Sequence, residues 1–114
     1  MSHQLNFIYN DSDWVAPSEY PDLRNANEVA IDLETKDPNL KTKGSGWATF
    51  DGGIVGFAVA ALGQQWYFPI QHDAGGNMDL AVTTAFMVDL LKRPCTKIFH
   101  NASYDVGWLL ANGF

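Results

Sequence analysis

Residues 28–35, with the sequence EVAIDLET, alternate between apolar and polar side chains. Successive side chains of a β-strand point to opposite faces, so this pattern predicts a strand with two different faces. Ile31 and Leu33 fall on one face, which predicts that this face is buried. Asp32 and Glu34 fall together on the other face, where two neighbouring carboxylates repel each other and are costly to desolvate. The predicted strand therefore constrains whatever lies beside its acidic face.

Two interpretations of this acidic face are open. A divalent cation bound between Asp32 and Glu34 would offset both the repulsion and the cost of desolvation. Alternatively, the chain leaves the core at this point and both carboxylates are hydrated. An isolated Asp-x-Glu is more often a pair of hydrated carboxylates than a metal site. The choice here therefore depends on other acidic segments of the chain.

A third acid follows another predicted strand, at residues 96–101. The strand ends at His100 and Asn101, and a helix is predicted to begin within a few residues, with Asp105 in its first turn. An acid at this position is common for a structural reason, since the helix dipole stabilises it by about 0.3–1 kcal/mol. Together with the acidic pair of the first strand, however, Asp105 supplies a third carboxylate that a sheet can bring to one edge.

The two acidic segments resemble the first two motifs of the DEDD-type 3′–5′ exonucleases, as Asp32-x-Glu34-Thr35 and Asn101-x-x-Tyr104-Asp105. The resemblance is strongest to the proofreading domain of phage-type family A DNA polymerases, and it extends from about Trp14 to the last residue. Further similar stretches lie at residues 32–40, 44–47 and 51–56. Either motif alone is a weak signal, whereas both motifs in this order, joined by the expected strands and helix, are a strong one.

The resemblance implies that the chain is part of a metal-dependent enzyme that hydrolyses the terminal phosphodiester at a single-stranded DNA 3′ end. In such sites two Mg²⁺ or Mn²⁺ ions, about 3.5–4 Å apart, activate the attacking water and neutralise the leaving oxygen. By resemblance, Asp32 binds both ions, Glu34 binds the ion that carries the attacking water, and Asp105 binds the other ion.

The resemblance also implies four residues that bind substrate. Asn101 and Tyr104 are expected to steady the terminal nucleotide and its phosphate. Thr35 is expected to contribute backbone near the 3′-hydroxyl. Leu33 is expected to contact a bound base, although a place in the core suits this side chain better.

The predicted elements follow the order β-β-β-α-β-α, which is how an RNase H-like fold of the α/β class begins. Strands are predicted at 28–34, 54–62, 65–70 and 96–101, and helices at 77–93 and between Asn101 and Gly113. Pro69 predicts an edge position for the third strand, and the long crossover before the fourth predicts a parallel neighbour in a mixed sheet. Residues 1–27 are predicted to be an extended lead-in to the domain at 28–114, with a short edge strand at 5–9 and with Trp14 packed back on the domain.

Details of the remaining segments are also predicted. Residues 35–53 are expected to form a long loop, and His72 beside Asp73 is expected to be a hydrated loop histidine more often than a metal ligand. Asn77 is the predicted N-cap of the first helix. The inward face of that helix is predicted from residues spaced as on a helix: Met78, Ala81, Val82, Ala85, Phe86, Leu90 and Leu91. The last helix, capped by Asn101 or Ser103, is predicted to turn three residues inward and to end before Gly113: Val106, Leu109 and Leu110.

The family's complete site contains a fourth carboxylate, four or five residues after a tyrosine or histidine that orients the water. The resemblance implies that these residues, with the last strand and helices of the fold, lie beyond Phe114. Because the chain begins with Met1, the missing part is expected on the C-terminal side only. The chain is then either a deliberately shortened polypeptide or the product of a split or interrupted polymerase gene, completed by a second chain or a downstream segment.

Composition and charge restrict the class of protein. With 114 residues, 46% of them hydrophobic and 13% aromatic, the sequence predicts one small folded domain and excludes a disordered chain. The net charge of −6 opposes DNA binding, so bound Mg²⁺ or other parts of a larger assembly must supply positive charge. No signal peptide is visible and no apolar run approaches the roughly 18 residues of a membrane span. The single Cys95 suggests a reducing compartment, and with the resemblance this places the chain in the cytoplasm of a phage-infected bacterial cell.

Three hypotheses of function follow. The chain is the N-terminal piece of a proofreading exonuclease, a catalytically incomplete module that docks on a polymerase or DNA end without cutting, or a structural subunit. The three carboxylates favour the first hypothesis, because a pure binding module has no need of clustered acids. The lack of a fourth ligand favours the second for this chain alone, and the third predicts no metal binding.

Overall fold

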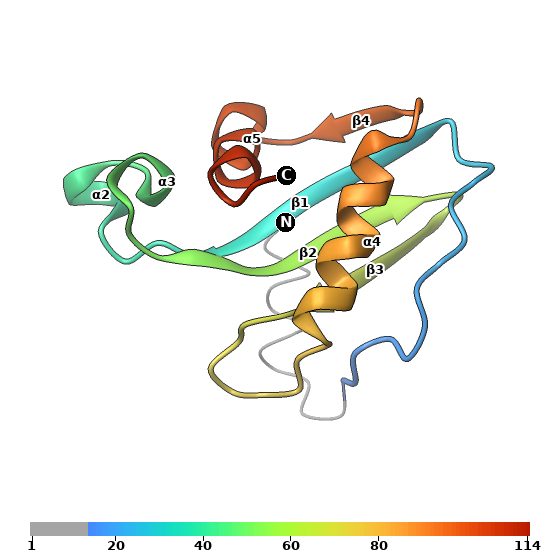
Figure 1. Ribbon diagram of the computed structural model, residues 1–114, viewed down its shortest axis with the longest axis horizontal. Helices are drawn as coiled ribbons and strands as arrows, with labels where there is room; N and C mark the ends of the chain where they lie inside the picture. Colours follow the sequence, from blue (N-terminus) through green and yellow to red (C-terminus); the bar gives the residue numbers. More distant parts are fainter. Residues whose placement is uncertain (1–13) are drawn as a thin grey trace.

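Four strands form one mixed sheet in the computed structural model, which describes residues 14–114 (Figure 1). The strands are β1 (Glu28–Lys36), β2 (Gly53–Ala61), β3 (Gln64–Pro69) and β4 (Thr96–Phe99). Their order across the sheet is β3-β2-β1-β4, with β1 antiparallel to β2, β2 antiparallel to β3, and β4 parallel to β1. The predictions of an α/β chain with a mixed sheet, an edge position for the strand with Pro69, and a parallel last strand are confirmed.

β2 and β3 are joined by a two-residue turn at Leu62 and Gly63. Both residues have positive φ angles, 54° and 73°, as a tight hairpin turn of this length requires. The turn lies one residue earlier than Gly63-Gln64, where the sequence suggested it. The burial pattern of β2 shows buried residues on both of its faces, as its continuous apolar sequence predicts.

The segment between β1 and β2 is more ordered than the predicted long loop. It contains two one-turn helices, α2 (Leu40–Lys43) and α3 (Gly46–Thr49), and β1 extends to Lys36. The Asp37 carboxylate accepts a hydrogen bond from the backbone N–H of Gly46. This hydrogen bond and the two short helices lie within one irregular segment, and no periodic pattern in the sequence predicts them.

α4 (Leu80–Lys92) begins three residues later than predicted, and the prediction of Asn77 as its N-cap is wrong. Asp79 is the N-cap, and its side chain accepts a hydrogen bond of 2.9 Å from the N–H of Val82. The side-chain amide of Asn77 instead exchanges two hydrogen bonds with the backbone of His72. Asn77 therefore closes the preceding loop and is not available to the helix.

The inward face of α4 also differs from the prediction. Its buried residues are Thr83, Met87 and Leu90, whereas Val82 is 53% exposed. Ala81 and Ala85 are exposed too, and Phe86, Met78 and Leu91 are half-buried at the margin of the core. The apolar residues of α4 are spread over most of its circumference, so their spacing alone does not select the face that meets the sheet.

Leu90 and Val82 provide a test of how α4 is seated. Leu90 is fully buried, so Leu90→Ala is expected to lower the free energy of unfolding by about 2–5 kcal/mol through lost burial and a cavity. Val82→Ala, on the exposed side of the same helix, is expected to change it by less than about 0.5 kcal/mol. Urea denaturation followed by circular dichroism measures both. Equal effects of the two substitutions would contradict this orientation of the helix.

α5 (Ala102–Ala111) follows β4 directly and lies with α4 over the same face of the sheet (Figure 1). Leu109 is buried as predicted, but the predictions for Val106 and Leu110 are wrong, since these side chains are 37% and 68% exposed. The other buried residues of the helix are Asp105, Gly107 and Trp108. Asn101 occupies the N-cap position without a capping side-chain hydrogen bond. The helix ends as predicted before Gly113, whose φ is +84°.

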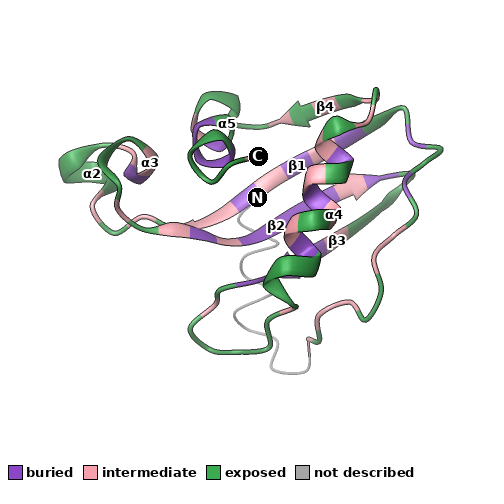
Figure 2. Cartoon of the chain, viewed as in Figure 1, coloured by how far each residue is buried: buried purple, intermediate pink, exposed green. Residues whose placement is uncertain are grey.

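The main core lies between the sheet and the helices α4 and α5, where β1, β2 and β3 turn their buried side chains (Figure 2). Trp14 packs on Tyr67 with ring centroids 6.0 Å apart, which confirms its predicted contact with the domain. The strand expected at 5–9 lies outside the described residues, and the boundary between lead-in and domain stays a prediction. Among residues 14–114, no helix is long and apolar enough to span a membrane.

Candidate metal and nucleic-acid site

The acidic face of β1 lies opposite small residues of β2. Asp32 is paired with Ala58, and Glu34 is paired with Gly56. Directly opposed residues on neighbouring strands share a face of the sheet, so a methyl group and a hydrogen atom are the side chains that face these two acids. Both acids are half-buried. The strand pairing thus places only a methyl group opposite Asp32, whereas the Tyr67 hydroxyl fills the space at Gly56, opposite Glu34.

Asp105 reaches the same region from the first turn of α5. The pairing of β4 with β1 ends at Phe99 and Ile31, and the chain then turns into α5 beside the remainder of β1. Asp105 is only 2% exposed. Its burial, and then the negative charge of Asp32, raise the pKa of Asp105 to about 6. The Asp32 side chain therefore lies close enough to Asp105 to influence its ionisation.

Glu34 and Asp32 are affected by the same surroundings. Burial, and then the charges of Asp32 and Asp105, raise the pKa of Glu34 to about 7. Burial also raises the pKa of Asp32, while the nearby His100 opposes that rise. We refer to Asp32, Glu34 and Asp105 as the carboxylate cluster. The structure brings these three predicted site residues together, and it does so by pairing a strand with a helix end that is distant in the sequence.

The carboxylate cluster has the donor chemistry of a Mg²⁺ or Mn²⁺ site, since these ions prefer carboxylate oxygens. One oxygen of Asp105, Oδ2, is buried and has no hydrogen-bond partner. Within residues 14–114, however, no three His, Cys, Asp or Glu side chains are spaced as a ready-made metal site. The donor types therefore fit such an ion, and the carboxylates would have to draw closer together to coordinate it.

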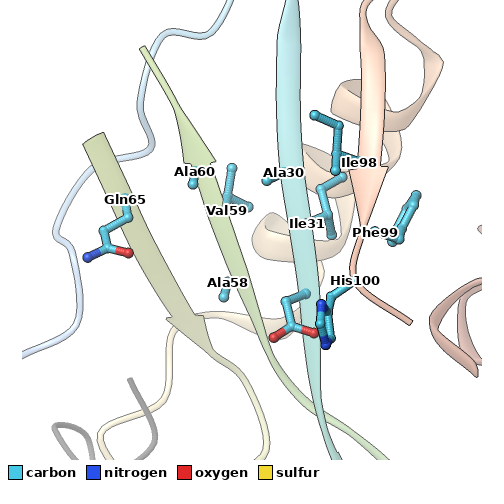
Figure 3. Close-up of a pocket in the computed structure, with 10 residues that line it drawn as sticks. Ala30, Ile31, Ala58, Val59, Ala60, Gln65, Ile98, Phe99 and His100 are labelled. Carbon is cyan, nitrogen blue, oxygen red and sulfur yellow. The ribbon is translucent and has the colours of Figure 1, made fainter. Parts of the chain in front are cut away.

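A pocket of about 660 Å³ opens over the face of the sheet that carries Asp32 (Figure 3). Its wall contains His100 and Gln65 at opposite sides, with the small side chains of Ala30, Ala58 and Ala60 along the strands between them. His100 was not among the predicted site residues. Its position directly after β4, next to the motif residue Asn101, is the signal in the sequence that points to it.

The four predicted substrate-binding residues occupy different environments. Leu33 is 7% exposed and belongs to the core, while Asn101 is exposed at the start of α5. The hydroxyl groups of Thr35 and Tyr104 are 2.9 Å apart. Tyr104 also donates a hydrogen bond of 2.7 Å to Oδ2 of Asp37. The roles of these residues toward a nucleotide stay predictions, but Tyr104 already has two partners within the protein.

The chain matches no protein-family model and no solved structure. It is similar to part of a phage protein. The two are 36% identical over 117 residues, and the relative is a protein of Pseudomonas phage M6 named DNA-directed DNA polymerase. The alignment covers 94% of this chain but 17% of the relative, so the chain spans about one sixth of the length of the protein it matches.

The raised pKa values predict how stability depends on pH in metal-free buffer. A carboxyl group with a higher pKa in the folded state binds its proton more tightly when folded, so the free energy of unfolding falls as pH rises from about 4.5 to 7. For Glu34 we expect a loss of roughly 1–2 kcal/mol, after allowance for its partial exposure. Glu34→Gln should recover this stability at pH 8 and have little effect at pH 4.5.

Thermal denaturation of the two proteins at both pH values measures this effect. Glu28→Gln is the matched control, because Glu28 is an exposed glutamate at the other end of β1. A stability gain at pH 8 that is equal in Glu28→Gln and Glu34→Gln would show that net charge, and not the carboxylate cluster, is responsible.

Proposed function

We propose that this chain is the N-terminal portion of the 3′–5′ proofreading exonuclease domain of a phage DNA polymerase of family A. The observation that carries this proposal is the carboxylate cluster, in which Asp32 and Asp105 raise the pKa of Glu34, and Asp32 raises the pKa of Asp105. The similarity to a phage protein named as a DNA polymerase supports it, because the aligned region covers nearly the whole chain. The mixed sheet with the order β3-β2-β1-β4 is compatible with an RNase H-like fold.

The proposed reaction is hydrolysis of the terminal phosphodiester of single-stranded DNA. Two bound Mg²⁺ or Mn²⁺ ions would supply an activated water and neutralise the leaving 3′-oxygen. Asp32 raises the pKa values of both Glu34 and Asp105, which supports a role in which its carboxylate would be shared between two ions. Glu34 and Asp105 would then each hold one ion.

The residues around the carboxylate cluster would orient the DNA end. The hydroxyls of Thr35 and Tyr104 lie beside one another. Thr35 follows Glu34 in the sequence, and Tyr104 precedes Asp105. The exposed Asn101 stands at the start of α5, the helix that carries Tyr104. Leu33 would act indirectly, because its side chain lies in the core and supports β1 beneath the acids. Neutralisation of the carboxylates by metal would also reduce the repulsion between DNA and a chain of net charge −6.

The proposal includes partners and a location. A downstream segment or a second chain would supply the fourth carboxylate, its neighbouring tyrosine or histidine, and the polymerase domains. This chain spans 17% of the relative, so the relative is long enough to contain such segments. The site of action would be the cytoplasm of a phage-infected bacterial cell.

A second candidate is a catalytically incomplete module that docks on a polymerase or DNA end without cutting. The observation that favours it is the lack of a ready-made three-ligand metal site within residues 14–114. This candidate predicts that no added segment of the polymerase makes the chain cleave DNA.

Metal binding by the chain itself tests the proposal. Mn²⁺ titration followed by electron paramagnetic resonance is expected to show weak binding, which Asp32→Asn abolishes because it removes the carboxylate common to both ions. Glu28→Gln removes one acid from the other end of the same strand and should bind Mn²⁺ like the wild type. Identical Mn²⁺ titrations of the wild type and Asp32→Asn would refute the metal site.

A further inference from the structure

We propose that Asp37 and Trp47 are positioning residues that hold α5, and with it Asp105, against β1. This inference rests on the proposed function, because it concerns the geometry of the same carboxylate cluster. Neither residue belongs to that cluster. Both lie in residues 37–52, the segment between β1 and β2 that contains α2 and α3, which we call the bracing segment.

The first observation is a chain of hydrogen bonds between the two halves of the carboxylate cluster. The Tyr104 hydroxyl donates to Oδ2 of Asp37 at 2.7 Å and lies 2.9 Å from the Thr35 hydroxyl. Tyr104 directly precedes Asp105, and Thr35 directly follows Glu34. The contact between Thr35 and Tyr104 therefore joins the residue adjacent to an acid of β1 to the residue adjacent to the acid of α5, and Asp37 holds the Tyr104 hydroxyl at this position.

The second observation is the close packing of Trp47 on Gly107. A Cβ atom at position 107 would collide with Cε2 of Trp47, so only glycine permits this approach. Gly107 is buried and lies two residues after Asp105. Among the helices and strands that pack near α5, its closest backbone neighbour is α3, which carries Trp47. Figure 1 shows α3 beside α5, beyond the end of the sheet.

The bracing segment is closed on itself, which makes it suitable as a support. The Asn39 side-chain amide donates to the Asp51 carboxylate at 2.6 Å, and the Asp51 N–H donates to the Gly46 carbonyl at 2.9 Å. The Gly46 N–H in turn donates to Asp37 at 3.0 Å. These bonds hold Asp37 and Trp47 in one unit that meets α5 at two points.

A support for α5 is useful here because strand pairing does not hold it. The ladder between β4 and β1 ends at Phe99 and Ile31, before α5 begins. The charge of Asp32, which raises the pKa of the buried Asp105, also opposes close packing of α5 against β1 when both acids are ionised. The contacts of Tyr104 with Asp37 and of Gly107 with Trp47 act directly on either side of Asp105.

The experiment measures Mn²⁺ binding by electron paramagnetic resonance on the full chain. Asp37→Ala is expected to weaken binding about 10-fold, as loss of a residue that orients a metal ligand typically does. Asp37→Asn keeps an oxygen that accepts from Tyr104 and is expected to restore most of the affinity. Asp73→Ala is the matched control: Asp73 is an exposed acid that pairs with Lys36 at the end of β1, so its removal changes the charge without touching α5.

Amide hydrogen exchange supplies a second measurement that does not depend on metal. Asp37→Ala and Trp47→Ala are expected to speed exchange in α5 at Trp108 and Leu109 while leaving Leu90 of α4 protected. If Asp37→Ala fails to fold, Tyr104→Phe removes the same hydrogen bond and is expected to weaken Mn²⁺ binding and loosen α5 in the same way.

The outcomes separate this inference from the proposed function. Wild-type Mn²⁺ affinity in Asp37→Ala, with binding lost in Asp32→Asn, would overturn the positioning role alone. Equal weakening in Asp37→Ala and Asp73→Ala would also overturn it, because charge would then explain the effect. If Asp32→Asn leaves Mn²⁺ binding unchanged, the proposed function fails, and unchanged exchange of α5 in Asp37→Ala would then overturn the positioning role as well.

Discussion

A polypeptide that continues this chain into the rest of a polymerase like its phage relative is expected to trim single-stranded DNA far faster than the 114-residue chain. We expect a difference of about 10²–10⁴-fold, the usual contribution of a group that positions or activates the attacking water. The three acids of the carboxylate cluster can collect metal, but they are not spaced as a complete site within the described residues. Two-metal hydrolysis depends on accurate placement of the reacting groups, so three acids without that geometry should give little activity.

The measurement is release of nucleotides from the 3′ end of a 5′-labelled oligonucleotide in Mg²⁺, with equal amounts of each polypeptide. Omission of Mg²⁺ and a 3′-blocked oligonucleotide are the controls for metal dependence and direction. Equally fast trimming by the 114-residue chain and the longer polypeptide would show that the chain contains, or obtains from a second copy, every group that the reaction needs.

Within the longer polypeptide, Asp32→Asn and Asp105→Asn are each expected to lower the trimming rate by about 10³-fold or more. A metal ion contributes several kcal/mol to the stabilisation of the transition state, and each 1.36 kcal/mol corresponds to a factor of about ten. Each substitution removes a charge from the carboxylate cluster while keeping the size of the side chain. The folded protein should survive, because both substitutions also relieve repulsion between buried acids.

Asp89→Asn and Glu28→Gln are the controls, since both acids are exposed and lie away from the carboxylate cluster. Polymerase activity of the same preparations should be unchanged, which separates loss of trimming from loss of folding. Rates within a factor of two of wild type for Asp105→Asn would mean that the buried acid of α5 serves the structure and takes no part in hydrolysis.

The sequence alone predicted the elements that carry the site. Alternation in β1 placed Asp32 and Glu34 on one face and Ile31 and Leu33 on the other, and the structure has this arrangement. Periods of two residues are visible in a sequence because each strand face has its own environment. Pro69 predicted an edge strand because proline has no backbone N–H to donate to a ladder, and β3 is at the edge.

The sequence did not predict which sides of the helices are buried. In α4 it favoured a row with Val82, whereas Thr83 and Met87 are buried. In α5 it favoured Leu110, whereas Trp108 is buried. Both helices are apolar over most of their surface, so several rotations about the helix axis bury similar areas. The choice between these rotations depends on the shape of the sheet and on neighbouring side chains, which local patterns do not contain.

The meeting of the three carboxylates is a joint product of sequence and tertiary structure. The residue types and their places near strand and helix ends were readable from the sequence, because each depends on neighbours along the chain. The burial of Asp105, the effect of Asp32 on its pKa, and the hydrogen bond from Tyr104 to Asp37, 67 residues away, were decided only by the tertiary structure. Such contacts depend on where β4 ends and how α5 then packs, and these distances arise only when the whole sheet has formed.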